Sequence, residues 1–162
     1  MLNKILVALD RSPASQTIFH HALVLAKAMP TELMLLHVLS TEDQGSPGLE
    51  AITTTGYYPV LQAEQIKLYQ QHWQAYVNES LTELQLMAEQ ANASGIATEI
   101  KQLSGQPGRT ICQVAQDWGA ELIMIGRRGH SGLSELILGS VSNYVVHHAS
   151  CSVFIVQLQA VN

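Results

Sequence analysis

Short apolar segments alternate with longer amphipathic segments along the chain, and this alternation predicts an α/β fold with a parallel sheet. The segments predicted to be strands are residues 4–9, 32–39, 98–103, 121–125 and 152–158. Four of them are nearly continuous runs of Leu, Ile, Val and Met, a pattern typical of parallel strands that helices cover on both faces. Only residues 98–103 alternate polar with apolar positions, so we expect one face of that strand to be less covered.

Segments of helical period connect the predicted strands. The predicted helices start at Ser12 and Pro13 (N-cap and first helical residue), near Val60, after the turn at residues 105–108, and near Gly139. Pro30 stops the first helix, and the last one reaches about Ala149. The helix over residues 60–93 keeps one apolar stripe and ends at Gly95 as its C-cap. It would span about 50 Å, so we expect its Gln-rich first half to overhang the sheet or to bend.

The 162 residues fit a single domain over residues 1–162, since one domain takes about 150 residues. One connection is long, namely residues 40–59, which are rich in Ser, Thr, Gly and Pro. Loops of more than about 15 residues are usually functional or disordered. The sequence leaves both interpretations open for this loop.

The charge balance argues against two classes of partner. Lys and Arg number 8 against 13 Asp and Glu, a formal net charge of −5, which disfavours a protein that binds duplex nucleic acid by neutralising phosphates. The longest apolar runs have about five residues, far fewer than the roughly 20 of a bilayer-spanning helix. We therefore expect neither a nucleic acid nor a membrane as partner. Cys112 and Cys151 allow at most one disulfide in a chain that does not need one, which favours a reducing compartment, the cytoplasm.

The segment after the fourth predicted strand carries the strongest functional signal. Gly126, Gly129 and Gly139 lie between that strand and the last helix, and Ser140 follows them. In an open parallel sheet, ligands bind beyond the carboxyl ends of the strands. Glycines let backbone N–H groups approach an anion, and a helix start adds unpaired N–H groups and the positive end of the helix dipole. With the Ser140 and Ser142 hydroxyls as further donors, the pattern predicts a phosphate-binding site.

A carboxylate and a cationic cluster complete the candidate site. Asp10 follows the first predicted strand, where it is placed to accept a ribose hydroxyl or to hold a divalent cation through water. A turn aspartate ahead of Ser12 is the alternative interpretation. Arg127, Arg128 and His130 form the one cationic cluster of the sequence, and we assign a phosphate contact to one of the three.

Other conspicuous side chains are assigned structural roles. The histidine pairs at residues 20–21 and 147–148 point about 100° apart on a helix and do not share a metal ion, so no metal ligand is assigned. His37, inside an apolar strand, is expected to be a core histidine with one backbone hydrogen bond. Cys112 is expected to be a buried, inert thiol. The aromatic residues of helical spacing that we assign to packing are Tyr69, Trp73 and Tyr76.

The spacing Gly126-x2-Gly129-x9-Gly139-Ser140 resembles the motif of the ATP-binding branch of the universal stress protein family. The residues outside this motif that match the same pattern are Asp10, Ser12 and Val38. Further matching segments are residues 5–10, 36–38, 105–107 and 150–153. The resemblance therefore covers essentially the whole chain.

This resemblance implies a fold and a site. The fold is a three-layer open sheet of five parallel strands in the order 3-2-1-4-5 with helices on both faces, Rossmann-like as in the adenine nucleotide alpha hydrolase-like proteins. Adenine lies near Val38 and Asp10, ribose near Asp10 and Gly126, and phosphates lie over the glycine-rich segment. The implied nucleotide-binding residues are Leu9, Asp10, Ser12, Val38, Ile125, Gly126, Arg128, Gly129, His130, Gly139, Ser140, Val141 and Ser142. The ligand is ATP, AMP or ADP, with Mg²⁺ beside a triphosphate, and the chain forms a homodimer through residues 152–158.

Two residues depart from the family pattern. Arg11 stands where the family often has a small residue, and Arg127 where Ser or Thr is frequent, which affects the choice of nucleotide more than binding itself. The chain has no Gly-x4-Gly-Lys-Ser/Thr loop, and no group stands out as a base for hydrolysis. We therefore favour a nucleotide-dependent regulatory protein of the stress response over an enzyme. A slow ATPase or nucleotidyl enzyme that uses Asp10 and a metal, and a nucleotide-free dimerisation module, stay open as alternatives, and the sequence identifies no protein partner.

Overall fold

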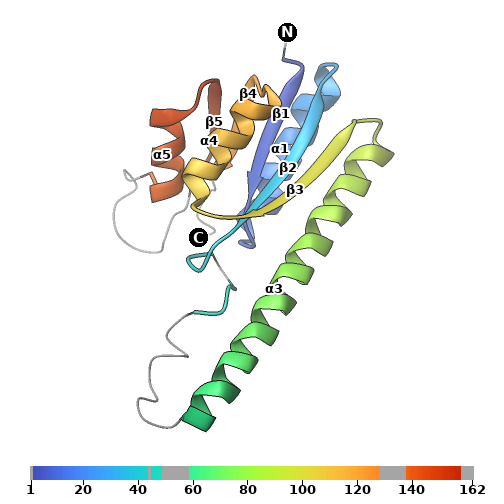
Figure 1. Cartoon of the computed structure of the whole chain (residues 1–162). Coiled ribbons are helices and arrows are strands. Elements are labelled where there is room, and N and C mark those ends of the chain that lie inside the picture. Colours follow the sequence, from blue (N-terminus) through green and yellow to red (C-terminus); the bar gives the residue numbers. More distant parts are fainter. Residues whose placement is uncertain (1, 44, 49–58, 128–137, 158–162) are drawn as a thin grey trace, which may run out of the picture.

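Five parallel strands form one open sheet in the order β3-β2-β1-β4-β5 in the computed structural model (Figure 1). Their bounds are β1 Lys4–Leu9, β2 Glu32–Leu39, β3 Thr98–Ser104, β4 Leu122–Gly126 and β5 Ser152–Val156. The structure describes the chain except residues 1, 44, 49–58, 128–137 and 158–162. The fold class and the strand order implied by the resemblance are confirmed.

The predicted strands agree with the observed ones to within a residue or two. β1 and β2 have the predicted bounds, while β3 and β4 each reach one residue further at their carboxyl ends and β4 starts at Leu122 rather than Glu121. β5 ends at Val156, and the predicted end at Leu158 lies outside the described residues. β1 is central in the sheet, with Ile5 opposite Leu33 of β2 on one side and opposite Leu122 of β4 on the other.

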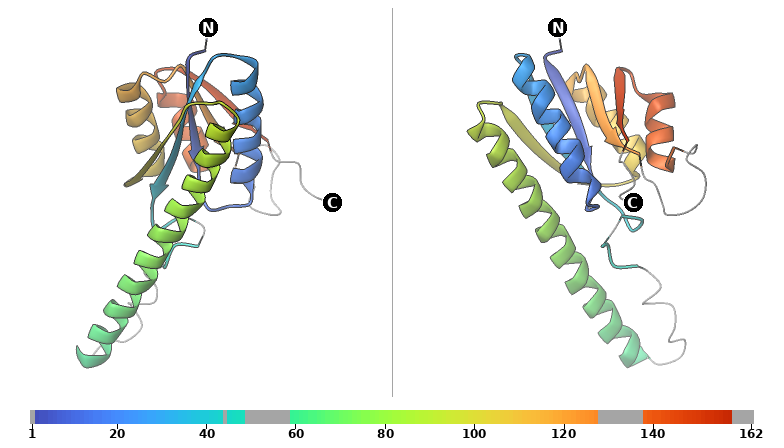
Figure 2. Two further views of the ribbon diagram at one scale, coloured as in Figure 1. Left: turned by 90° about the vertical axis from the view of Figure 1, so that its right-hand side faces the viewer. Right: turned by 180° about the vertical axis from the view of Figure 1, so that it is seen from behind.

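The helices form one layer on each face of the sheet, as the two views of Figure 2 show. Their bounds are α1 Ala14–Ala28, α3 Pro59–Ala93, α4 Pro107–Trp118 and α5 Ser140–His148. α1 and α3 cover one face, with Phe19 and Leu84 in the core there, and α4 and α5 cover the other, with Ile111 and Val145 in a second core. No helix within the described part of the chain is long and apolar enough to cross a bilayer.

Helix α3 extends straight beyond the sheet, which settles the predicted choice between an overhang and a bend (Figures 1 and 2). Its first buried side chain in the described part is Tyr76. The buried side chains of α3 are Tyr76, Ser80, Leu84, Met87, Ala88 and Ala91, whereas Tyr69, Trp73, Val77 and Leu81 of the predicted stripe are half-buried. The helix ends at Ala93, as predicted, and Gly95 follows with a φ of 80°, a conformation that favours glycine.

The edges of the sheet are less covered than its centre. β3 alternates half-buried with exposed positions, as predicted for residues 98–103. β5 was expected to be covered on both faces, and this prediction is wrong. Val153 and Ile155 pack against the α4/α5 core, but Phe154, which points to the other face, is 43% exposed. The reason is topological, because α1 and α3 cover the strands at the other side of the sheet and reach β5 only at Val156.

Candidate functional site

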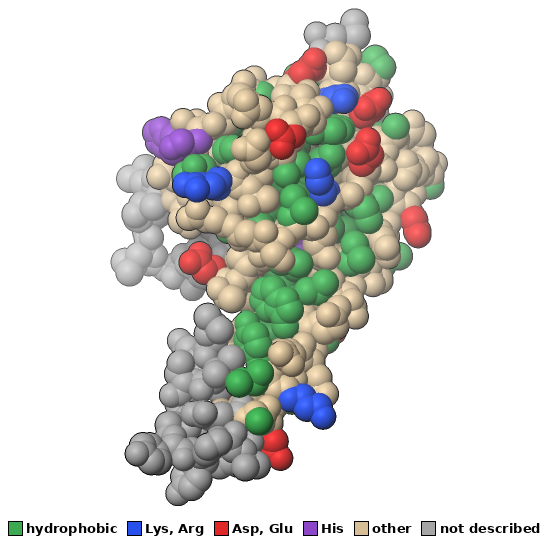
Figure 3. Space-filling model, viewed as in Figure 1, with side chains coloured by type: hydrophobic (Ala, Val, Ile, Leu, Met, Phe, Trp, Pro, Cys, Tyr) green, Lys and Arg blue, Asp and Glu red, His purple; other side chains and the backbone are tan. Residues whose placement is uncertain are grey.

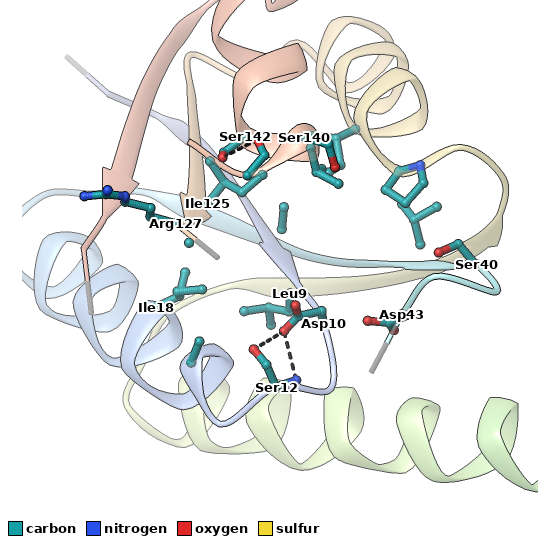
Figure 4. A pocket seen from close by; sticks show the side chains of 18 of the residues that line it. Leu9, Asp10, Ser12, Ile18, Ser40, Asp43, Ile125, Arg127, Ser140 and Ser142 are labelled. Atoms are coloured by element: carbon teal, nitrogen blue, oxygen red, sulfur yellow. Dashed lines mark hydrogen bonds between the residues drawn. The ribbon is translucent and has the colours of Figure 1, made fainter. Parts of the chain in front are cut away.

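A cavity of about 620 Å³ lies at the carboxyl ends of β1, β2 and β4 (Figure 4). Pockets of this size hold small molecules and cofactors in other proteins. The predicted site residues that line it are Leu9, Asp10, Ser12, Val38, Ile125, Gly126, Gly139, Ser140, Val141 and Ser142. The structure therefore brings together all predicted site residues that it describes. Arg128, Gly129 and His130 lie outside the described residues, as does most of the loop predicted at residues 40–59.

The turn after β1 is organised by the Asp10 carboxylate. Its Oδ1 accepts hydrogen bonds from the Ser12 backbone N–H at 2.9 Å, from the Ser12 hydroxyl, and from the Ser15 hydroxyl at 3.0 Å. Asp10 thus has the turn role that the sequence left as an alternative, and it also lines the cavity. The prediction that Ser12 is the N-cap of α1 is wrong. Pro13 holds the cap position, and the Ser12 hydroxyl donates to Asp10 Oδ1 instead of accepting from an N–H group of the helix.

The end of β4 approaches α1 closely at Gly126. A β-carbon placed at Gly126 would come within 2.6 Å of Ile18 Cδ1, so a side chain here would displace Ile18, which also lines the cavity. The backbone N–H of Arg127 donates to the carbonyl of Val156 at 3.0 Å, which holds the strand end in place. The Arg127 side chain lies at the margin of the cavity in Figure 4. Glycine at residue 126 therefore lets α1 pack closely on the end of β4.

The N-terminus of α5 lies in the cavity wall opposite the Asp10 turn (Figure 4). Gly139 holds the N-cap position, and no side chain of the described residues caps this end. Ser140 is exposed, whereas Ser142 is buried and its hydroxyl donates to the Gly139 carbonyl at 3.0 Å. Of the two hydroxyls predicted as donors to a ligand, that of Ser142 is thus bound within the helix. A helix start of this kind presents N–H groups and a positive partial charge.

The wall beside β2 contains residues that the sequence analysis did not assign. Ser40, Glu42 and Asp43 follow β2 and line the cavity. The rule that located Asp10 applies to them too, because they follow the carboxyl end of the strand next to β1. Other lining residues not assigned before are Ala8, Pro13, Ala14, Ile18, Leu36, Pro107 and Ile111. Their apolar side chains gave no signal beyond that of a core.

His37 is buried, as predicted, but its predicted backbone hydrogen bond is absent among the described residues. Its Nε2 lies 2.7 Å from Asp43 Oδ2, and its Nδ1 has no partner in that part of the chain. The Tyr76 hydroxyl donates to the same Asp43 oxygen at 2.5 Å. Burial, and next the hydrogen bond to Asp43, raise the pKa of Tyr76, so the phenol keeps its proton. The prediction failed because a polar partner lay within reach in the following loop.

Arg11 points away from the cavity and toward α3. Its guanidinium donates to Glu83 at 2.9 Å and to Glu79 at 3.0 Å, and it lies 5.8 Å from the centre of the Tyr76 ring. The hydrogen bond to Glu83 raises the pKa of Arg11 most, although partial burial opposes it. This departure from the family pattern therefore serves contacts between the β1 turn and α3.

The side chains set aside as structural have partners within their own helices or cores. His21 Nδ1 lies 2.8 Å from the Thr17 carbonyl, and His148 Nδ1 lies 2.8 Å from the Tyr144 carbonyl. Within the part of the chain that the structure describes, no three His, Cys, Asp or Glu side chains group as metal ligands. Cys112 is half-buried rather than buried, and desolvation raises the pKa of its thiol.

The sequence is similar to known proteins along nearly its whole length. The model of the Universal stress protein family matches residues 1–157. The universal stress protein Sll1388 of Synechocystis sp. is 37% identical over 158 residues, which are 95% of this chain and 97% of that protein. The universal stress protein YxiE of Bacillus subtilis is 35% identical over 163 residues, 97% of this chain and 100% of that protein.

Solved structures with the same fold cover nearly the whole chain. The hypothetical protein MJ0577 has a TM-score of 0.72 and 21% identity, with 99% of each chain covered. A universal stress protein in complex with cAMP has a TM-score of 0.63 and 22% identity, with 96% of this chain and 97% of that one covered. The universal stress protein from Archaeoglobus fulgidus in complex with dAMP has a TM-score of 0.55 and 18% identity, with coverage of 96% and 98%.

Proposed function

Since this chain belongs to the universal stress protein family, we propose that it binds an adenine nucleotide in the cavity at the carboxyl ends of β1, β2 and β4. One observation carries the proposal. The N-terminus of α5, which no described side chain caps, lies in the wall of a cavity of about 620 Å³. A phosphate group is the ligand that such a helix start favours, because it accepts from several N–H groups at once.

The residues around the cavity divide into two chemical halves. Near α5, the Gly126 and Gly139 backbones and Arg127 suit phosphate oxygens. Near β1 and β2, Asp10 and Val38 suit a nucleoside, since a carboxylate accepts from ribose hydroxyls and an apolar wall covers a base. The two family members in complex with cAMP and dAMP support an adenine nucleotide as the ligand class.

For the site residues outside the described part of the chain, we propose the roles that the family motif implies. Arg128, Gly129 and His130 would approach the phosphates from the glycine-rich segment, as in the ATP-binding branch, and ATP is the ligand we favour over ADP and AMP. Beside a triphosphate, the alternative role of the Asp10 carboxylate would be to hold Mg²⁺ through water, because Mg²⁺ usually keeps several waters and is bound by one or two carboxylates and the substrate phosphates. Mg²⁺ would supply charge neutralisation there.

In the cell, we propose that the single domain over residues 1–162 acts as a nucleotide-dependent regulator of the stress response in the cytoplasm. A homodimer through residues 152–158 is part of this proposal. The exposed edge of β5, with Phe154 43% exposed, supports it, since an uncovered apolar edge strand is a site for pairing with another chain.

The experiment is a calorimetric titration of the protein with ATP, ADP and AMP, with and without Mg²⁺, on wild type, Gly139→Ala and Gly139→Val. Gly139 has φ −59° and ψ 157°, a conformation open to any residue, so we expect neither variant to strain the backbone. We expect the affinity for ATP to fall stepwise with side-chain size, because each added carbon blocks approach to the α5 N–H groups. An unchanged affinity in Gly139→Val, or no binding by wild type at millimolar nucleotide, would refute the proposal.

Measuring the amount of intact ATP over time distinguishes an enzyme from a binding protein. A slow ATPase that uses Asp10 would convert stoichiometric ATP over hours and would lose this activity in Asp10→Asn. A binding protein leaves the ATP intact over the same time. The dimerisation-module alternative requires an intact dimer without nucleotide affinity in the same titration.

A further inference from the structure

Asp43 is a wall residue of the cavity whose carboxylate is held by two side chains behind the wall. Its Oδ2 accepts a hydrogen bond from the Tyr76 hydroxyl at 2.5 Å and lies 2.7 Å from His37 Nε2. Since a carboxylate only accepts, Nε2 carries the proton and donates. The three residues come from three elements, the loop after β2, helix α3 and strand β2. One oxygen atom therefore joins the cavity wall to the core and to α3.

The burial of this cluster makes its hydrogen bonds costly to lose. Asp43 is 7% exposed, and His37 and Tyr76 are each 2% exposed. A buried carboxylate is tolerated only with hydrogen-bond partners, so the bonds from Tyr76 and His37 fix where Asp43 stands. The Asp43 backbone N–H also donates to the carbonyl of Ser40 at 3.3 Å, which links a second wall residue to the same position.

Among the residues that the structure describes, none that lines the cavity belongs to α3. We propose that Tyr76 is nevertheless a positioning residue of the nucleotide site, because its hydrogen bond to Asp43 holds the β2-side wall in the shape that accepts the ligand. The inference rests on the proposed function and assigns to α3 a role in it. A wall that is already ordered costs less conformational entropy on binding than one that the ligand must order.

Tyr76 also lies close to the turn after β1 and to the aromatic side chains of the overhang. Arg11, on the β1 turn, lies 5.8 Å from the centre of its ring and pairs with α3 through Glu79 and Glu83. On the other side, the Trp73 ring lies 5.4 Å from the Tyr76 ring, and Tyr69 is stacked on Trp73 at 6.3 Å. Figure 3 shows hydrophobic side chains following α3 outward from the body of the molecule. Trp73 is therefore a reporter next to Tyr76.

Reciprocity gives the proposal a second consequence. If the Tyr76–Asp43 bond favours nucleotide binding, then the nucleotide must favour the bond by the same factor. A bound nucleotide would thus restrict Tyr76, and the emission of the neighbouring Trp73 would change. The chain has two tryptophans, so Trp118→Phe leaves Trp73 as the single tryptophan, whose emission is excited apart from that of the tyrosines.

The test compares Tyr76→Phe with Tyr69→Phe in the Trp118→Phe background. Both substitutions remove one phenol hydroxyl from α3, but only Tyr76 bonds to Asp43. We expect the affinity for ATP to fall about tenfold in Tyr76→Phe, since a hydrogen bond to a charged group is lost, and to change less than about twofold in Tyr69→Phe. At saturating ATP, we expect the change in Trp73 emission to persist in Tyr69→Phe and to vanish in Tyr76→Phe.

The outcomes separate the inference from the proposed function. If the Trp118→Phe parent does not bind ATP while wild type does, the Trp118→Tyr parent replaces it. If wild type does not bind ATP, the proposed function fails and this inference with it. If wild type binds and Gly139→Val does not, but Tyr76→Phe keeps the affinity and the emission change of Tyr69→Phe, only this inference is overturned.

Should Tyr76→Phe lose its cooperative melting transition, Asp43→Asn decides, because it keeps the side chain's size and removes its charge. An affinity loss of similar size then supports the inference, and wild-type affinity overturns it.

Discussion

Ile18 Cδ1 lies 2.6 Å from the position that a β-carbon would take at Gly126, so α1 packs on the end of β4 with no room for a side chain there. Both residues line the cavity. The contact thus fixes the distance between a helix of one layer and the strand end that leads to the glycine-rich segment.

Gly126→Ala should destabilise the protein by about 1 kcal/mol, because the added methyl group forces the end of the Ile18 side chain to move in a packed core. Ile18→Val removes Cδ1, and the next atom, Cγ1, lies 3.4 Å away. The double variant should therefore be more stable than the sum of the two single changes predicts. Urea unfolding of the four proteins measures the coupling, and strictly additive free energies would contradict the steric explanation.

Acid should weaken the hydrogen bonds between Asn3 in the N-terminal segment and Glu121, which precedes β4. Glu121 accepts from the Asn3 backbone N–H at 2.6 Å and from the Asn3 side-chain amide at 3.2 Å, and the backbone hydrogen bond lowers the pKa of Glu121 most. A folded pKa below the unfolded one gives stability that is complete above the ordinary value of 4.5 and is lost as the pH falls through the folded pKa.

The check is the melting temperature of wild type and Glu121→Gln as a function of pH. Wild type should melt higher at neutral pH, and the difference should vanish below the folded pKa. Glu99→Gln, at an exposed position of edge strand β3, is the matched control and should show no such dependence. A difference that persists unchanged in acid would contradict the prediction.

Arg11→Gln should cost less than about 1 kcal/mol of stability at low salt, since both of its ion pairs are open to water. The partners Glu79 and Glu83 are 61% and 47% exposed. At about 1 M salt, where charges are screened beyond roughly 3 Å, most of the difference should disappear. Urea titrations at two ionic strengths measure it, with Lys101→Gln as the control without a salt-dependent effect.

Phe154→Glu should convert the proposed dimer into monomers, because a carboxylate would replace the exposed phenyl ring on the uncovered face of edge strand β5. Val24→Glu, at a 55% exposed position of α1 on another part of the surface, should leave the dimer intact. Light scattering after size exclusion gives the mass of each. A dimer that survives Phe154→Glu would place the interface elsewhere.

The local pattern was sufficient to predict where the elements lie and that edge strand β3 is less covered, but not that edge strand β5 is. β1 and β2 have their predicted bounds because their apolar runs end in polar turn residues. β5 has the same apolar composition, yet Phe154 is exposed, since coverage depends on which helices return over that end of the sheet. The spacing of apolar residues predicts which side of an element tends to be buried. It does not show which distant segments of the chain pack against that side.

The candidate site shows the same limit. Asp10 and Gly139 could be assigned from the sequence, because the carboxyl ends of strands and the starts of helices are local features. The position of Asp43 after β2 was open to the same rule, but its hydrogen bonds were not, because His37 and Tyr76 lie 6 and 33 residues away and only the folded chain brings them together. The Ser12 hydroxyl was wrongly assigned to the helix for a similar reason. The shape of the turn, which the sequence does not show, brings this hydroxyl to the Asp10 carboxylate.

Helix α3 has no buried side chain among its described positions before Tyr76. The described turns of the overhang therefore contribute no side chain to the core, and they can open without exposing it. In heavy water, the amides of α3 should therefore form two populations. Those before Tyr76 should exchange through local fraying, and those after it only when the domain unfolds, so the two halves of one continuous helix belong to different cooperative units.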